Sequence, residues 1–275
     1  MSDVSYPKKN RLSTFLRADI QPRYTDWLLL ACCFTSGVVD STIYNAYNTF
    51  VSMQTGQSLS PPSISISYSH KEYTGNTIFV GLGASNQNPR PYGWARSLTS
   101  IGCFIIGSFL FARLNRLLGS KKRGTLILSF LLQVVMLILT AALVTGGAIA
   151  GIPEDPFSTS EAETEWTQEV PIVLLSIQSA GQIVASRALG FNEIPTVVIT
   201  SLICDMMSDP KLFLLRNEKR DRRLLAFVLT MVGAIAGGWI TKGTGDIYAS
   251  LWIAAGIKLG IAGAWVFWGD EVVSS

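Results

Sequence analysis

The fold follows from Trp27-Leu-Leu-Leu-Ala-Cys-Cys-Phe-Thr-Ser-Gly-Val-Val-Asp40, the start of an apolar run that continues to residue 49 and contains one acid. Crossing the hydrocarbon of a bilayer takes about 20 helical residues, so this run predicts a membrane helix. Asp40 lies about thirteen residues into the run, near mid-membrane at a rise of about 1.5 Å per residue. Because a carboxylate is costly at that depth, Asp40 is a candidate functional residue.

Five further apolar runs are long enough to span a membrane: 94–112, 124–149, 170–188, 224–241 and 248–268. From Gly124 to Pro153 there is no charged residue at all. Two shorter apolar pieces, 76–85 and 194–207, are bounded by Gly or Pro and are too short to cross alone. We therefore expect an all-α, polytopic membrane helical bundle with about six spanning helices and two short broken segments.

The overall composition agrees with this class. Of the 275 residues 48% are hydrophobic and 15% are charged, and the mean hydropathy is +0.35. Soluble domains carry about 25% charged residues. We expect a polar basic N-terminal tail over 1–25, a single multi-pass transmembrane domain over 26–270 and a short tail over 271–275.

The sequence lacks the residues that several classes of function require. The one histidine, His70, lies in a polar insert, and the four cysteines lie in apolar segments without metal-ligand spacing. The sequence has no phosphate-binding glycine loop and no basic patch interleaved with aromatic residues. We therefore expect no cofactor, no metal, no nucleic-acid partner and no enzymatic activity, and the lipid bilayer is the expected environment.

The distribution of charge predicts the topology. Five basic residues lie in the 113–123 loop and six in the 209–223 loop, whereas the 152–169 loop holds six acids and no Lys or Arg. Lys and Arg favour the cytoplasmic side, so we expect both basic loops and the basic N-terminus there. Six spans satisfy these placements, whereas eight would move the 113–123 loop to the other side. Which membrane is involved does not follow from the sequence.

The two halves of the chain share a plan. Residues 27–149 and 170–268 each run as a long helix, a short broken piece and two long helices, and six spans would give the halves opposite orientations. Inverted repeats with paired interrupted segments point to the central site of a transporter. The alternative is that any six-helix chain divides into two groups of three.

A serine-rich insert interrupts the first half. It separates Met53-Gln54-Thr55-Gly56 from Thr74-Gly75-Asn76, and excising residues 57–75 would join the two pieces into one apolar segment. We interpret the insert as a translated intron or a lineage-specific loop, and less readily as a gating loop. Without it the short piece would be long enough for a seventh span.

Two motifs resemble those of a known family. The Gly-x-x-Asp of residues 37–40, followed by the split Met-x-Thr-Gly and Thr-Gly-Asn, is the first. The second is Ser176-Ile-Gln-Ser-Ala-Gly-Gln-Ile-Val-Ala-Ser-Arg-Ala-Leu-Gly-Phe-Asn-Glu-Ile-Pro-Thr-Val-Val-Ile-Thr200. Together they resemble the YoaK-like integral membrane family of bacteria and fungi, catalogued as domain of unknown function 1275, with this chain as a fungal-type member. The resemblance implies a multi-pass membrane protein with no established substrate or reaction.

Two groups of residues are candidates for a binding site. Lys258 lies near the centre of the last run, and we expect it to pair with Asp40 because an ion pair would relieve both desolvation costs. Thr74, Gly75 and Asn76 open a broken helix whose freed backbone groups could bind an ion or a polar solute. For Asp40 and Lys258 the alternative is an inert buried pair.

Two glutamines add a third group. Gln178 and Gln182 are four residues apart and therefore share a helix face. Hydrogen bonding between helices is the common role of such residues, and a contribution to a solute site is the alternative.

Glycine spacing indicates close helix packing near the C-terminus. Gly233/Gly237 and Gly256/Gly260 are both G-x-x-x-G pairs, which let helix backbones approach. We favour contacts inside one chain over an oligomer built through either pair.

Taken together, these patterns favour a transporter or permease for an unknown small solute, with a site near mid-membrane. The alternative is a non-transporting membrane scaffold or assembly protein, since no group of residues is an unambiguous site.

Because the insert is polar and off-pattern, deleting residues 57–75 is expected to leave membrane integration unchanged. Expression and detergent stability of the deletion variant, compared with the full chain, test this. Loss of integration would contradict it.

Overall fold

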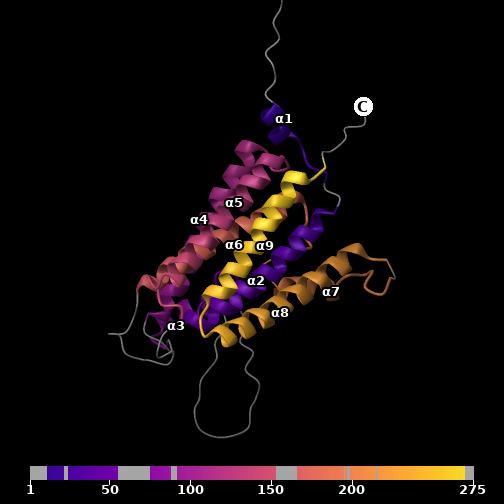
Figure 1. Cartoon of the computed structure of the whole chain (residues 1–275). Coiled ribbons are helices and arrows are strands. Elements are labelled where there is room, and N and C mark those ends of the chain that lie inside the picture. Colours follow the sequence, from indigo (N-terminus) through magenta and orange to yellow (C-terminus); the bar gives the residue numbers. More distant parts are fainter. Residues whose placement is uncertain are drawn as a thin grey trace, which may run out of the picture.

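The computed structural model describes residues 11–21, 24–54, 75–87, 92–152, 166–194, 196, 199–214 and 216–269. Its α-helices are α1 (Arg11–Arg17), α2 (Thr25–Tyr47), α3 (Asn76–Ala84), α4 (Gly93–Leu118), α5 (Arg123–Thr145), α6 (Glu169–Leu189), α7 (Ile199–Met207), α8 (Glu218–Thr244) and α9 (Tyr248–Phe267). A short 3-10 helix, η2 (Trp166–Gln168), precedes α6. Figure 1 shows the long helices running side by side along a bundle.

In the described part of the chain, six helices are long and apolar enough to cross a membrane: α2, α4, α5, η2 with α6, α8 and α9. The predicted all-helical, multi-pass bundle is therefore confirmed. The helices extend further into the basic loops than we expected: α4 includes Arg113 and Arg116, and α8 begins at Glu218. The 113–123 connection shortens accordingly to four residues, 119–122.

Hydrogen bonds define one end of the bundle, here called the α1 end. The Ile20 amide donates to the Lys121 carbonyl (3.1 Å), and the Gln21 amide donates to the Gly269 carbonyl (3.1 Å). The Arg123 side chain donates to the Trp268 carbonyl. The α4–α5 connection, the C-terminal end of α9 and the segment before α2 therefore lie together.

The opposite end is called the α3 end. There the Tyr47 hydroxyl donates to the Ala150 carbonyl (3.0 Å), and the Trp252 indole donates to the Thr145 hydroxyl (3.0 Å). The α5–α6 connection is thus at the α3 end, and the basic α4–α5 connection is at the α1 end. This separation agrees with six spans. Five of the six acids of the 152–169 loop fall at 153–165, outside the described residues.

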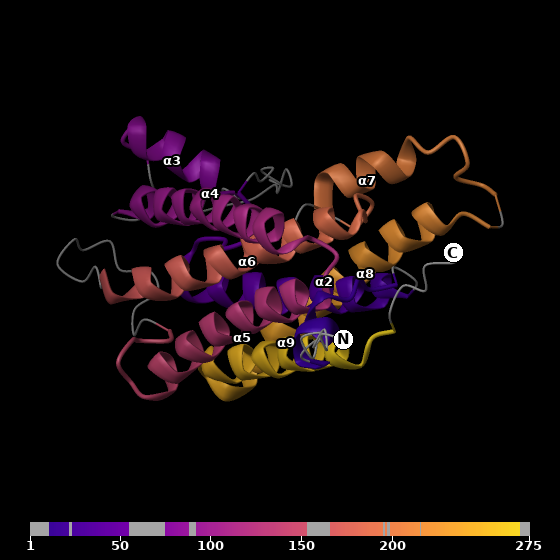
Figure 2. The ribbon, with the colours of Figure 1, turned by 90° about the horizontal axis from the view of Figure 1, so that it is seen from above.

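The two short pieces are helical and lie at opposite ends of the bundle. Figures 1 and 2 show α3 at one end beside α4, and α7 at the other end beside α8. The second piece is shorter than predicted, because α7 covers 199–207 rather than 194–207.

The helix contacts follow an inverted repeat. If α2, α3, α4 and α5 are exchanged for α6, α7, α8 and α9, the contact of α2 with α8 becomes that of α6 with α4. The same exchange turns the α3–α4 contact into the α7–α8 contact, the α2–α9 contact into the α6–α5 contact, and the α4–α5 contact into the α8–α9 contact, and all of these contacts are present. The α5–α9 and α2–α6 contacts are unchanged by the exchange. A chain divided arbitrarily into two groups of three has no reason to satisfy all of these exchanges.

Burial of the spans follows the same exchange. In the most apolar 18 residues of each span, the buried share is 67% in α2 and 61% in the span that contains α6. It is 22% in α4 and 28% in α8, and 44% in both α5 and α9. Each half therefore contributes one central, one peripheral and one intermediate helix, which supports the inverted-repeat interpretation over an arbitrary division.

Glycines set the closest helix approach, between α2 and α8. A Cβ on Gly233 would overlap the Phe34 carbonyl oxygen, and one on Gly37 would overlap the Thr230 carbonyl oxygen. The Gly233/Gly237 pair thus packs within the chain, as we favoured, and is not free to form an oligomer contact. By contrast, Cβ atoms on Gly256 and Gly260 would meet nothing within 4 Å.

These two glycine pairs give a matched test. Gly233→Ala is expected to destabilise the protein by about 1–3 kcal/mol, because the new methyl group forces α2 and α8 apart. Gly260→Ala adds the same group in open space and is expected to leave stability unchanged or raise it by up to about 1 kcal/mol. Thermal unfolding in detergent measures both. Equal losses for the two variants would contradict the α2–α8 contact.

Candidate functional site

A polar layer divides the apolar core at mid-depth. One buried cluster occupies the α1 half, with α2 as far as Cys33 and α9 from Ile261 onward. A second cluster occupies the α3 half, with α2 from Val39 onward and α9 as far as Ala255. The spanning helices place buried polar side chains between the two clusters: Ser36, Gln133, Ser176, Gln178, Ser179, Gln182 and Lys258.

Lys258 is the charged member of this layer. Its side chain is 1% exposed, and it lies ten residues, or about 15 Å, along α9 from Tyr248. The Nζ atom donates to Gln133 Oε1 (2.6 Å) and to Gln182 Oε1. Gln182 in turn donates from Nε2 to Ser36 Oγ (2.7 Å). An isolated charge at this depth costs about 2.5–3.5 kcal/mol, which the amide oxygens offset in part.

Asp40 holds the chain where it leaves α2. Its Oδ1 accepts hydrogen bonds from the amides of Val51 (3.1 Å) and Ser52 (3.0 Å), and its Oδ2 accepts from the Ser52 hydroxyl. The carboxylate is 4% exposed. These bonds satisfy backbone donors that the end of the helix leaves without helical partners inside the membrane.

The expected ion pair between Asp40 and Lys258 is wrong. Each side chain has its own set of hydrogen-bond partners, and every ion pair found among the described residues lies at the α1 end. Both residues are buried, as predicted, but only Lys258 lies in the polar layer. Depth along a helix follows from sequence position, but the partner depends on helix rotation and on which neighbours supply donors.

Asn76 ties α3 to the segment after α2. Its Oδ1 accepts from the Thr49 hydroxyl (2.9 Å) and the Phe50 amide (3.1 Å), and its Nδ2 donates to Gln54 Oε1 (2.9 Å). The Thr77 amide also donates to the Gln54 carbonyl (3.1 Å). Residue 54, before the insert, and residues 76 and 77, after it, therefore lie together. Gly75 precedes α3 with φ 115°, a conformation that glycine adopts most readily.

The remaining predicted residues have different outcomes. Thr74 and the insert at 57–73 lie outside the described residues. Gln182 lies in the polar layer with Lys258 and also donates to the Thr196 carbonyl (3.4 Å) beyond the end of α6. Gln178 is buried but bonds only to its neighbour Ser179 (3.0 Å), and its Oε1 has no partner in the described chain.

The repeat makes Asp40 and Gln182 equivalent. Asp40 lies seven residues before Tyr47, the last residue of α2, and Gln182 lies seven residues before Leu189, the last residue of α6. Each side chain bonds to the segment that follows its helix: Asp40 to residues 51 and 52, and Gln182 to residue 196.

Gln133 and Lys258 are equivalent in the same way. Each lies ten residues after the first residue of its helix, α5 or α9, and the two side chains bond to each other. The hydrogen bond therefore joins equivalent positions of the two repeats.

A family model described as a protein of unknown function (DUF1275) matches residues 69–264. The chain belongs to this family. No curated protein and no solved structure matches it. The matched region of this DUF1275 member contains Gln133, Gln182 and Lys258, but it begins after Asp40.

Sequence reasoning missed Gln133. The residue stands in the middle of the charge-free run 124–153, where a large amide side chain is itself unusual, so its polarity was an available signal. Ser36 was also missed. A serine inside an apolar helix is common, and only the position of Gln182 shows that it belongs to the layer.

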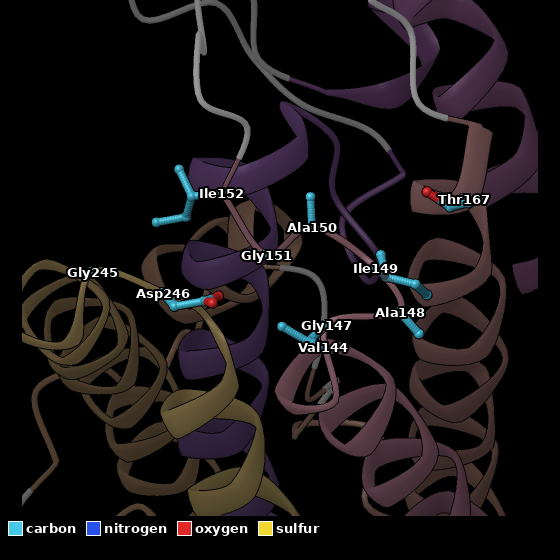
Figure 3. Close-up of a pocket in the computed structure, with 10 residues that line it drawn as sticks. All are labelled: Val144, Gly147, Ala148, Ile149, Ala150, Gly151, Ile152, Thr167, Gly245 and Asp246. Carbon is cyan, nitrogen blue, oxygen red and sulfur yellow. The ribbon is translucent and has the colours of Figure 1, made fainter.

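A hollow of about 610 Å³ opens at the α3 end. Figure 3 shows it between the α5–α6 connection and the start of α9, with the Asp246 carboxylate pointing toward Gly151. Its lining is formed mainly by small and apolar residues, Val144, Gly147, Ala148, Ile149, Ala150, Gly151, Ile152, Thr167, Gly245 and Asp246.

The separate partners of Asp40 and Lys258 predict additive effects. Asp40→Asn is expected to cost about 1–3 kcal/mol because two backbone amides and a hydroxyl lose a charged acceptor. Combined with Lys258→Met, the losses should add to within about 0.5 kcal/mol. Unfolding of the two single variants and the double variant in detergent measures this. Partial rescue in the double variant would restore the ion-pair interpretation.

Proposed function

We propose that this protein is a small-solute transporter that works by alternating access, with its solute bound at the polar layer. The observation that carries the proposal is the inverted repeat, in which every principal contact within and between the halves has a counterpart. Interrupted segments at opposite ends and polar side chains at the repeat interface are the features that such transporters share. Rocking of one set of helices against the other would open the layer to each side in turn.

Ion pairs close the α1 end between the peripheral helix α8 and the central helices. Arg222 on α8 bonds to Asp26 at the start of α2 (3.0 Å) and to Glu193 after the end of α6 (3.1 Å). The next residue, Arg223, pairs with Asp209 before α8 (3.3 Å). A hydrogen bond from Asn217 and the charge of Arg223 lower the pKa of the Asp209 carboxyl, so it stays ionised at neutral pH.

The repeat places an equivalent pair at the α3 end. Exchanging the halves brings the start of α2, which carries Asp26, onto the start of α6, which carries Glu169, and the first turns of α8, which carry Arg222, onto those of α4, which carry Arg96. The charge of Arg96 attracts the Glu169 carboxylate. Within the described residues, however, neither carboxylate oxygen of Glu169 makes a hydrogen bond.

This asymmetry supports two alternating states. Among the described residues, Asp26 pairs with Arg222 at the α1 end, whereas the Glu169 carboxylate has no hydrogen-bond partner at the α3 end, where the hollow of about 610 Å³ lies. In the second state the Glu169–Arg96 pair would close and the Asp26–Arg222 pair would open. The positive-inside rule assigns the α1 end, with the N-terminus and the basic connections, to the cytoplasm.

A non-transporting scaffold is the second candidate. The hydrogen bonds of Asp40 favour this candidate. They all go to residues 51 and 52, so Asp40 has a structural role. The two functions differ in motion, because a scaffold has no need to exchange ion pairs between its ends.

The native cysteines of α2 report such motion. Cys32 and Cys33 are fully buried on the α1 side of the polar layer, whereas Cys103 and Cys204 are more accessible and are replaced by Ser for the test. Arg222→Gln is expected to raise the rate of labelling by a membrane-impermeant thiol reagent applied from the α1 side. The increase should be roughly fivefold if the lost ion pairs are worth about 1 kcal/mol.

Arg220→Gln is the matched control. Arg220 lies on the same turn of α8, but it bonds to Asp221 and to carbonyls of the preceding segment rather than to α2. We expect labelling to stay at the starting rate in this variant and to fall in Arg96→Gln, whose loss weakens the second state. Unchanged labelling in both Arg222→Gln and Arg96→Gln would favour the scaffold.

A further inference from the structure

No acid of the described residues balances the charge of Lys258. The residue is 1% exposed, and within this part of the chain its Nζ donates only to the amide oxygens of Gln133 and Gln182. Among the residues with described positions, the ion pairs are confined to the α1 end. A buried charge that has only neutral partners is unfavourable in the membrane core, and charged residues there mark solute or ion pathways.

Asp40 cannot supply the counter-charge. Its three hydrogen bonds hold residues 51 and 52, and these bonds replace helical partners that the backbone has lost. If Asp40 turned toward Lys258, two buried amides would be left without acceptors, and each unpaired group would carry its own cost.

The groups around Lys258 can donate hydrogen bonds to an anion. Gln133 carries an NH₂ group whose bond to Ser129 Oγ is long (3.5 Å), and rotating this amide would present the NH₂ group in place of the oxygen that now faces Nζ. Neither a cation nor a neutral solute would fit as well. A cation would be repelled by Lys258, and a neutral solute would leave its charge without a partner.

Thr196 provides an independent observation at the same place. Its carbonyl accepts from Gln182 Nε2 (3.4 Å), and its hydroxyl is buried without a partner in the described chain. Its φ is 54°, which is strained for a β-branched residue. Strained backbone and unpaired polar groups are held in this way where a protein binds a ligand.

We infer that the solute of the polar layer is a small monovalent anion, with Lys258 as its counter-charge and Gln133 and Thr196 as hydrogen-bond donors. The inference rests on the proposed transport function and specifies its substrate class. The anion would displace the Gln133 oxygen from Nζ. It would bind where equivalent positions of the two repeats meet, and both access routes would lead to this point.

Thermal unfolding of the purified full chain in a series of sodium salts tests the inference. Sodium chloride, sodium nitrate and sodium acetate are compared with sodium gluconate at equal ionic strength. At least one of the three small anions is expected to raise the unfolding temperature above the gluconate value in a saturable way. The effect should disappear in Lys258→Met. It should persist in Lys242→Met, where the lysine removed lies over Trp239 at the end of α8.

A second variant covers the case in which Lys258→Met does not fold. Thr196→Val keeps the side-chain shape and removes the hydroxyl, so the half-saturating anion concentration should rise about tenfold, as expected for a lost hydrogen bond to a charged group. The inference is overturned if no small anion differs from gluconate. It is also overturned if Lys258→Met keeps the full anion effect, or if Thr196→Val binds as the unmodified chain does.

Proteoliposomes separate this inference from the transport proposal. Uptake of the stabilising anion under a potential that is positive inside supports both. Stabilisation by the anion without its uptake would support the anion-binding site and contradict the transport proposal. If a cation is taken up and Lys258→Met does not reduce that uptake, the transport proposal is supported and the inference that the solute is an anion is contradicted.

Discussion

Inside a bilayer every backbone amide and carbonyl must find its partner within the protein, and this chain leaves the helical conformation twice at the ends of its central helices. After α2 the freed backbone is held by Asp40 and Asn76. After α6 it is held by Ser186, whose hydroxyl lies 2.6 Å from the Ile194 carbonyl, and by Gln182. Most of the buried polar side chains near the two breaks are explained by this constraint. Lys258 is not, because it contacts no freed backbone group.

The two halves share geometry but differ in chemistry. Equivalent positions carry Asp40 and Gln182 in the central helices, and Gln133 and Lys258 in the intermediate ones. One repeat thus contributes an acid that supports the backbone, and the other contributes a base that has no counter-charge among the residues whose positions are described. A symmetric scaffold with asymmetric side chains can offer similar motion at both ends and a single chemical preference at the centre.

Much of the fold was predictable, because charge-free runs of sufficient length indicate membrane-spanning helices. Gly75 and Pro195 marked both breaks correctly. The site was only partly predictable. Sequence position indicated that Asp40 and Lys258 are buried, but it did not identify their partners, since helix rotation is set by contacts such as that of Gly233 with α2. Gln133 is uncharged, so it did not stand out by the cost of its burial.

The order in which the helices are synthesised has a consequence for assembly. The principal contacts of α2 are with α8, α9 and α6, all from the second half of the chain, and those of α6 with spanning helices are with α4, α5 and α2. When α2 enters the membrane, the surfaces that will cover it have not yet been translated. Until those helices are made, α2 is surrounded by lipid and Asp40 is already inside the membrane. Any factor that shields α2 from lipid at this stage would therefore change the yield of folded protein rather than its final stability.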